Sequence, residues 1–229
     1  YSTANYLRVG SYALVPANLA LASGSTANCV SCSVSYTSGT LTITPAQLLA
    51  TVTPGAMTYN ANTAITSTTV LSGAGVFAGV PSGVSGVTTL TAASPNAGVT
   101  AINNGGTLLS GPDAANFTVT TTVLVPQAAG GPTNGVAAPG TATTDGSGYT
   151  INIAKAPLVY SGVVRSSVYT SNAQTNTGAT LTSGTLYSTD NFTIAGYASA
   201  TNVSQGTVAD ILVATPAGST VANNYAITY

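Results

Sequence analysis

Charge is almost absent from this sequence. Its 229 residues include only 3 basic and 4 acidic side chains, and they contain no histidine and no tryptophan, whereas about a quarter of the residues in an ordinary soluble domain are charged. The lack of a basic patch argues against binding to nucleic acid or to anionic lipid. No apolar run reaches the ~18 to 20 residues of a membrane-spanning helix. A net charge of −1 favours self-association instead.

The few acidic residues offer little for catalysis. Without histidine or glutamate, a general base has to be one of the aspartates, which are far apart in the sequence: Asp113, Asp145, Asp190 and Asp210. We expect these carboxylates to lie on loops or caps in contact with solvent, and we expect a protein that is not an enzyme and holds no cofactor.

Two cysteines lie close together, in Cys29-Val30-Ser31-Cys32. They supply only half of a four-ligand zinc site, and no Asp-x-Asp-x-Asp run is present for calcium, so no metal site is predicted. A redox dithiol is one interpretation of this spacing, but the strand-to-helix turn that activates such thiols is not evident. A local structural disulfide between Cys29 and Cys32 is the favoured interpretation for an exported protein.

Hydrophobic residues make up 44% of the chain, enough to bury a core. They alternate with Ser, Thr or Asn, as in residues 33–36, 40–43, 117–119 and 149–153, a pattern typical of half-buried antiparallel strands. Dipeptides such as Asn104-Gly105 suit tight turns between such strands. The sequence therefore predicts an all-β protein with antiparallel, sandwich-like domains.

Two markers indicate an internal repeat. The segments SYALVP (11–16), NFTVTT (116–121) and NNYAITY (223–229) share a pattern that places Tyr12, Phe117 and Tyr225 at one position, with spacings of 105 (117 − 12) and 108 (225 − 117). The segment GTLTITPAQL (39–48) returns as GYTINIAKAPL (148–158) at an offset of 109 (148 − 39). We therefore expect N-terminal strands in residues 1–44, a complete domain in 45–154, and a second domain without its closing strand in 155–229.

Residues 45–154 resemble a known class of bacterial repeat. The stretch LLSGPDAANFTVT (108–120), with AMTYNANTAITSTTVLSG (56–73) before it and GYTINIAKAPL after it, is similar to the YDG and MBG repeats of filamentous-haemagglutinin-like exoproteins. Tyr59-Asn60-Ala61 departs from the Tyr-Asp-Gly signature of those repeats. The resemblance implies export to the bacterial cell surface, an all-β array and adhesive or fibre-forming work.

The repeat is out of phase with the two ends of the sequence. Three explanations are open: a fragment of a longer array, internal closure of one chain, or a subunit that completes its neighbours by strand addition. Strand addition would use alternating residues at the two ends, namely Tyr12, Leu14, Tyr36, Leu41, Ile43, Asn224, Tyr225, Ile227 and Tyr229.

We therefore expect a structural subunit of an extracellular surface fibre, a homopolymer in which each copy binds the next head to tail. The alternative is an adhesin segment of a larger secreted protein that binds a host or matrix ligand. A binder would concentrate exposed aromatic residues in loops, whereas a polymer subunit would concentrate apolar strand residues at its ends.

Overall fold

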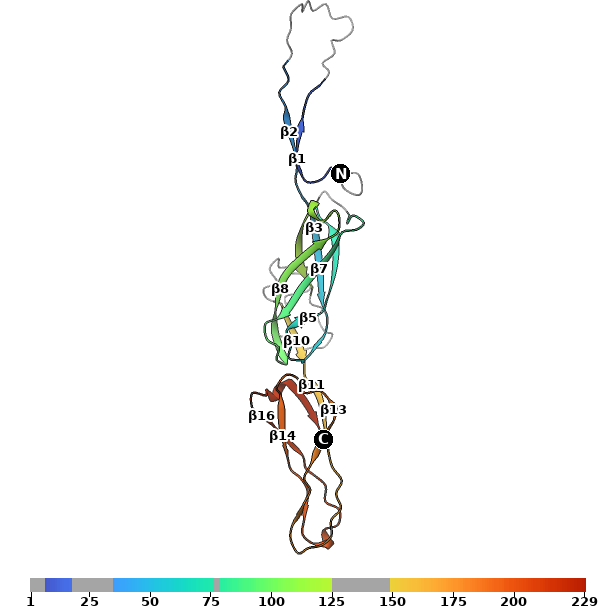
Figure 1. The fold of residues 1–229 in the computed structure, drawn as a ribbon, viewed down its shortest axis with the longest axis vertical. Coiled ribbons are helices and arrows are strands. Elements are labelled where there is room, and N and C mark those ends of the chain that lie inside the picture. The colour runs from blue at the N-terminus through green and yellow to red at the C-terminus, as the bar shows by residue number, and fades with distance from the viewer. Residues whose placement is uncertain (1–6, 18–34, 76–78, 125–148) are drawn as a thin grey trace, which may run out of the picture. The chain divides into compact units, whose positions relative to one another are not determined.

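The computed structural model describes residues 7–17, 35–75, 79–124 and 149–229 (Figure 1). These residues form β-strands and three short 3-10 helices, which confirms the predicted all-β class. The strands are β1 (Gly10–Leu14), β2 (Gly39–Ile43), β3 (Ala46–Pro54), β4 (Met57–Thr58), β5 (Ala64–Ile65), β6 (Ser67–Gly73), β7 (Ser85–Ala92), β8 (Gly98–Ser110), β9 (Phe117–Val123), β10 (Thr150–Ala154), β11 (Ala156–Gly162), β12 (Gln174–Thr175), β13 (Ala179–Gly184), β14 (Asn191–Ala195), β15 (Ser199–Ala200), β16 (Val213–Ala217) and β17 (Tyr225–Thr228). The helices are η1 (Ala114–Asn116), η2 (Val203–Gln205) and η3 (Ala222–Asn224). None of the helices in this part of the chain could cross a membrane.

Hydrogen bonding groups the described strands into several small sheets. The largest sheet has the order β4-β10-β8-β7-β5, and two three-stranded sheets have the orders β6-β3-β9 and β13-β11-β17. The pairs β1-β2, β12-β15 and β14-β16 form two-stranded sheets.

The chain divides into two compact units. The first contains Tyr1–Ala50, Val70–Val87 and Thr107–Thr121, and the second contains Thr51–Thr69, Thr88–Gly106 and Thr122–Tyr229. This division does not follow the expected ranges 1–44, 45–154 and 155–229, which stay a prediction. Strand ends do fall near the expected boundaries, because β2 ends at Ile43 before β3 begins at Ala46, and β10 ends at Ala154 before β11 begins at Ala156.

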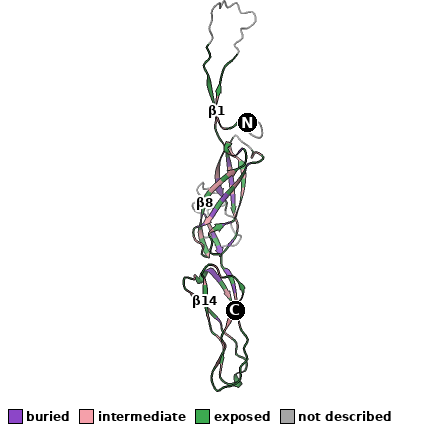
Figure 2. Cartoon of the chain, viewed as in Figure 1, coloured by how far each residue is buried: buried purple, intermediate pink, exposed green. Residues whose placement is uncertain are grey.

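Alternation of apolar and polar residues explains the strands of the core. In β10, Ile151 and Ile153 are buried while Asn152 between them is exposed, as expected for a strand with one face on the core. In β3, Leu48, Ala50 and Val52 are each fully buried. Figure 2 shows the same mixture of buried and exposed positions along the strands. Period-2 patterning is therefore a sound predictor of the buried faces here.

Two expectations about strand pairing were wrong. The strands are not all antiparallel, because β10 pairs in parallel with β4, and β11 pairs in parallel with β17. Parallel neighbours need a long connection, which local sequence patterns do not reveal. Asn104 and Gly105 lie inside β8 and form no hairpin turn. The Asn104 side chain accepts a hydrogen bond from the backbone N–H of Gly106, which has a φ of 81°, so the pair marks a local irregularity within the strand.

Leu158 provides a test of this core. It is fully buried in β11, and the substitution Leu158→Ala is expected to lower the free energy of unfolding by about 2–5 kcal/mol, because it removes apolar contacts and leaves a cavity. Chemical denaturation followed by circular dichroism measures this change. Val87→Ala is the control, since Val87 is 67% exposed. Equal stability of the two variants would contradict the packing described.

Candidate functional site

The described aspartates are buried or half-buried, and Asp190 and Asp210 accept hydrogen bonds from neighbouring groups. Asp113 is 2% exposed. Asp190 accepts hydrogen bonds from two tyrosine hydroxyls, and Asp210 accepts hydrogen bonds from the Asn176 side chain and from the backbone N–H of Ala198. All three lie on loops or caps, as expected, since Asp113 caps η1 and the other two lie outside strands and helices. The expected contact with solvent was wrong for Asp113, which is buried, whereas Asp190 and Asp210 are half-buried. Asp145 lies outside the described residues.

No metal centre is formed by the part of the chain that the structure describes, where no three potential ligands gather. Cys29 and Cys32 lie outside the described residues, so their predicted disulfide stays a prediction.

The most strongly buried polar site lies beside the junction of β10 and β11, within the second unit. Asn224 of η3 is 1% exposed, and its side-chain Oδ1 accepts a hydrogen bond of 2.8 Å from the backbone N–H of Ala97. Its Nδ2 donates a hydrogen bond of 3.0 Å to Oδ1 of Asn96. Both polar atoms of this amide are therefore paired, and they connect η3 to the residues just before β8. Only Lys155 separates β10 from β11 along the chain.

A cluster of aromatic rings lies next to this amide. The rings of Tyr59 and Tyr225 pack edge to face with centroids 5.2 Å apart, and Tyr59 makes a similar contact with Tyr187 and Tyr225 with Phe192. The hydroxyls of Tyr59 and Tyr225 donate hydrogen bonds of 2.6 Å and 2.8 Å to the same oxygen, Oδ2 of Asp190. Such edge-to-face pairs and bonds to a charged acceptor stabilise a fixed arrangement of side chains.

The environment of these tyrosines disfavours their ionisation. Burial raises the pKa of Tyr59, and the neighbouring Asp190 carboxylate raises it further. Burial also raises the pKa of Tyr225, with Asp190 adding to the effect, although a hydrogen bond from the Tyr187 backbone acts in the opposite direction. Both hydroxyls therefore remain hydrogen-bond donors at neutral pH.

The same asparagine contact occurs in the first unit. Oδ1 of Asn116, at the end of η1, accepts a hydrogen bond of 3.0 Å from the backbone N–H of Val9. Asn116 and Asn224 are 108 positions apart (224 − 116), and each precedes an aromatic residue that begins a strand. Their partners, Val9 and Ala97, each precede a glycine that begins a strand.

The strands that begin at those glycines also pair alike. In the β1-β2 pair, Gly10 lies opposite Ile43 and Tyr12 lies opposite Leu41. In the β8-β10 pair, Gly98 lies opposite Ile153. The corresponding register continues with Thr100 opposite Ile151. Tyr12 therefore corresponds to Thr100 of β8, and the expected match of Tyr12 with Phe117 and Tyr225 was wrong.

A side-chain contact recurs beyond these strands. The Ser72 hydroxyl donates to the Leu49 carbonyl at 3.5 Å, and the Thr182 hydroxyl donates to the Val159 carbonyl at 3.1 Å. Both partners are shifted by 110 positions (182 − 72 and 159 − 49). The sheets that contain them, β6-β3-β9 and β13-β11-β17, have matching orders.

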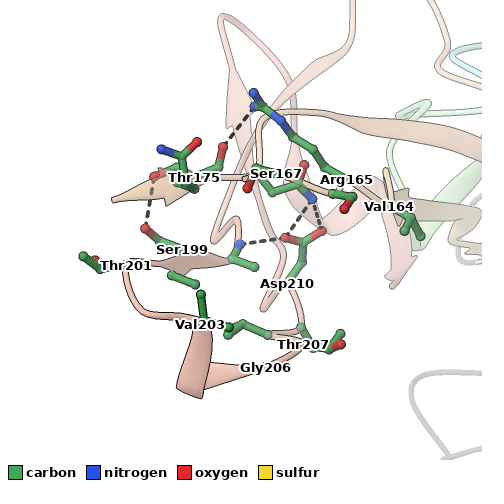
Figure 3. Close-up of a pocket in the computed structure, with 18 of the residues that line it drawn as sticks. Val164, Arg165, Ser167, Thr175, Ser199, Thr201, Val203, Gly206, Thr207 and Asp210 are labelled. Atoms are coloured by element: carbon green, nitrogen blue, oxygen red, sulfur yellow. Dashed lines mark hydrogen bonds between the residues drawn. The ribbon is translucent and has the colours of Figure 1, made fainter. Parts of the chain in front are cut away.

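A cavity of about 540 Å³ lies within the second unit, at the side of its C-terminal strands (Figure 3). Residues 162–169 and 206–210 line it, together with 174–176 and 198–203. Asp210 anchors this wall through Asn176, at 3.0 and 3.2 Å, and through Ala198, at 2.6 Å. A Cβ at Gly162 would overlap the Asp210 carboxylate, so a larger residue there would displace Asp210 from these bonds. The Arg165 guanidinium donates to the Thr175 carbonyl at 3.3 Å.

The predicted end residues fall into two groups. Asn224 and Tyr225 are buried and Ile227 is half-buried, because β17 pairs with β11 in the same chain. These residues are thus already paired, and the expectation that NNYAITY needs an outside partner along this edge was wrong. Tyr229 is 57% exposed, and its hydroxyl accepts a hydrogen bond from the Ala214 backbone. The residues at the other end are half-buried or exposed, namely Tyr12, Leu14, Tyr36, Leu41 and Ile43.

Sequence reasoning missed the roles of Asp190 and Tyr59 and the residues of the cavity. The recurrence of an asparagine before the aromatic residue, in AANF (114–117) and ANNY (222–225), was a signal for the asparagine contact. No sequence signal paired Asp190 with Tyr59, which lie 131 positions apart.

Comparisons with protein-family models, with curated proteins and with solved structures give no match to this chain.

The tyrosine–aspartate cluster predicts a loss of stability at high pH. The pKa values of Tyr59 and Tyr225 are raised above 10.0, so above about pH 10 the folded state retains protons that the unfolded state releases, and the free energy of unfolding falls as the pH rises. Urea denaturation between pH 8 and pH 11 measures this fall. Tyr59→Phe is expected to be less stable than the wild type at pH 8 by about 1.5–3 kcal/mol, through loss of the bond to Asp190, and to show a shallower fall.

Tyr169→Phe is the control for this experiment, because Tyr169 is 57% exposed and its variant should follow the wild-type curve. Parallel pH curves for Tyr59→Phe and the wild type would show that Tyr59 does not titrate as described.

The buried amide predicts protection of the chain at Lys155. Asn224→Ala leaves the Ala97 N–H and the Asn96 side chain without this partner, so local opening should be more frequent and tryptic cleavage after Lys155 about tenfold faster. Gel analysis of a digestion time course measures the rate, with cleavage after the exposed Arg165 as the internal reference.

Asn223→Ala is the matched control for this substitution, because Asn223 lies in the same helix and is exposed. An unchanged ratio of cleavage after Lys155 and Arg165 in Asn224→Ala would argue against a fastening role.

Proposed function

We propose that this chain is a non-enzymatic structural module of an extracellular bacterial surface fibre, built from tandem β-sandwich-like repeats. The recurrent asparagine contact carries the proposal, since Asn116 holds Val9 and Asn224 holds Ala97 in the same way. In a tandem arrangement, each of these side chains belongs to one repeat and binds the backbone of the preceding repeat. Asn116 binds the residue just before β1, and Asn224 binds the residue just before β8. Fixed joints between successive modules are what a load-bearing fibre requires.

The chemistry of the chain supports the same conclusion. The described aspartates that could act as a base are engaged in structural hydrogen bonds or buried. The surface has little charge, so copies experience little mutual repulsion and associate readily. The resemblance of residues 45–154 to the YDG and MBG repeats of exported adhesins points to the same location and class of protein.

The proposed partner is another copy of the chain. A head-to-tail contact joins two different surfaces, and such contacts extend into filaments unless their rotation closes a ring. The two ends of the described chain differ in this way, since the apolar residues of β1 and β2 are exposed or half-buried at one end and the cavity lies among the C-terminal strands.

Immunogold electron microscopy tests this proposal on intact cells of the source organism. Antibodies raised against the purified chain are expected to label fibres that extend from unpermeabilised cells, and the label should disappear when the serum is first absorbed with the chain. Label that appears only after permeabilisation would contradict an extracellular role. Label spread over a smooth cell envelope would contradict a fibre.

A further inference from the structure

Strand β10 provides an example of how this fold closes a gap between two strands. It lies between β4, with which it pairs in parallel, and the start of β8, with which it pairs antiparallel. Ile151 and Ile153 of β10 are 9% and 1% exposed. On either side of β10, Met57 and Ile102 are also buried. One strand with two apolar residues on one face therefore buries both of its neighbours.

The segments that connect the C-terminal strands contain counterparts of both neighbours, although residues 165–166 and 206–210 form no strand themselves. The Gly55 N–H donates to the Thr66 carbonyl, as the Val163 N–H donates to the Gly178 carbonyl. The two donors are 108 positions apart (163 − 55) and the two acceptors are 112 apart (178 − 66). The offset of the donors makes residues 165–166 the counterpart of β4. The same offset places Gly98, where β8 begins, opposite Gly206. Both glycines have positive φ, 119° and 63°, a conformation that residues with a Cβ rarely adopt.

These counterparts are among the walls of the cavity, and none of residues 165–166 and 206–210 is buried, whereas Met57 of β4 and Ile102 of β8 are buried. Residues 163–169 are all exposed, and Val164 and Val168, which both line the cavity, are 98% and 83% exposed. Among the described residues, no strand lies between 165–166 and 206–210. An open gap with apolar side chains on its walls favours the addition of an extended segment.

We propose that this gap, the acceptor groove, binds residues Gly39–Ile43 of a second copy of the chain. This inference rests on the proposed fibre function and names the contact between subunits. Strand β2 fits the groove because its pairing with β1 has the register of β10 with β8, and its Leu41 and Ile43 match Ile151 and Ile153. Leu41 is 37% exposed in the chain by itself, so binding in the groove buries surface that is otherwise in contact with water.

The register of β10 defines the contact in detail. With Ile43 in the place of Ile153, Ile43 lies opposite Gly206, Thr42 opposite Thr207, and Leu41 opposite Val208. Residues 165–166 form the parallel neighbour, along the edge of β2 that β1 does not use. Residues 206–210 replace β1 along the other edge, so the backbone hydrogen bonds of β2 are exchanged rather than lost. The additional burial of Leu41, Ile43 and the groove walls provides the driving force.

Charge does not oppose this contact. The segment 35–45 contains no charged residue, and the two charges of the groove are engaged within their own chain, Asp210 with Asn176 and Ala198 and Arg165 with Thr175. Binding therefore does not bury an unpaired charge on either side of the contact.

Disulfide cross-linking between two differently substituted full-length chains tests the contact. One chain carries Thr42→Cys and the other carries Thr207→Cys, both in a background with Cys29→Ser and Cys32→Ser. Thr42 and Thr207 face each other in the proposed register, so mild oxidation of the mixture should give at least about tenfold more heterodimer than Thr42→Cys mixed with Ser219→Cys, whose cysteine lies outside the groove. Because each chain has a single cysteine, a heterodimer can form only between copies.

A proline pair tests whether the backbone of the groove makes the contact. The Ile102 N–H donates to the Tyr149 carbonyl across the β8-β10 pair, whereas the Ala101 carbonyl accepts from Ala93 on the other side. N–H directions alternate along a strand, so the Thr100 N–H points to β10 like that of Ile102, and the Ala101 N–H points away. By the offset of 108, Thr100 corresponds to Val208 and Ala101 to Ala209. The Val208 N–H is therefore directed at the incoming strand, and the Ala209 N–H is directed away. Adding Val208→Pro to the Thr207→Cys chain should abolish the excess of heterodimer, and adding Ala209→Pro should leave most of it.

The outcomes separate this inference from the proposed function. A heterodimer yield no higher than that of the Ser219→Cys mixture overturns the acceptor groove, and if immunogold still labels fibres, the fibre proposal stands without it. Equal loss of cross-linking in the two proline variants also overturns strand pairing at residues 206–210. If cross-linking is lost with Val208→Pro but the antibodies label no fibre, the contact is supported and the proposed fibre function is contradicted.

Discussion

A buried side-chain amide must find a partner for its oxygen and for its nitrogen, because each polar atom left unpaired away from water costs free energy. Asn224 meets this requirement chiefly with Asn96 and Ala97, the residues just before β8. Small displacements of η3 relative to β8 would break both bonds together. The aromatic rings around Asp190 pack beside this amide, and Tyr225, the next residue, pairs with Ala156 at the start of β11. The asparagine and the ring cluster therefore act together at the β10-β11 junction.

The near absence of charge makes such neutral contacts more important. A chain with 3 basic and 4 acidic residues has few ion pairs with which to orient its parts, so hydroxyl, amide and backbone groups provide the directional bonds. Tyrosine suits this role because its ring buries apolar area while its hydroxyl still donates a hydrogen bond. Tyr59 and Tyr225 do both, and they direct their hydroxyls at one of the few carboxylates in the chain. The same economy explains why Asp190 and Asp210 are structural.

Local patterns in the sequence predicted what depends on neighbouring residues, and they did not predict what depends on distant ones. The alternation in residues 149–153 identified the buried face of β10 correctly, since the period of a strand is a local property. The parallel pairing of β11 with β17 joins residues about 70 positions apart, and no local pattern encodes it. The match of Tyr12 with Phe117 was based on local sequence similarity. The strand registers show instead that Tyr12, opposite Leu41, corresponds to Thr100, opposite Ile151. The domain ranges remain predictions, because the compact units divide the chain differently.

In the proposed array, the order of strands couples each repeat to the next. The strand that closes one repeat runs almost directly into the strand that opens the following one, with a single residue between β10 and β11. A closing strand cannot leave its groove without pulling on the first strand of the next repeat, and the asparagine contact adds a second connection across the same boundary. In linear repeat proteins, stability is the sum of the repeats and of the interfaces between neighbours. Two connections at each boundary increase the interface contribution, so a chain of such repeats resists separation at its joints more than an isolated repeat resists unfolding at its edge. An unfilled groove at the end of such an array is then its least stable point, which is the physical reason for a subunit to bind another copy there.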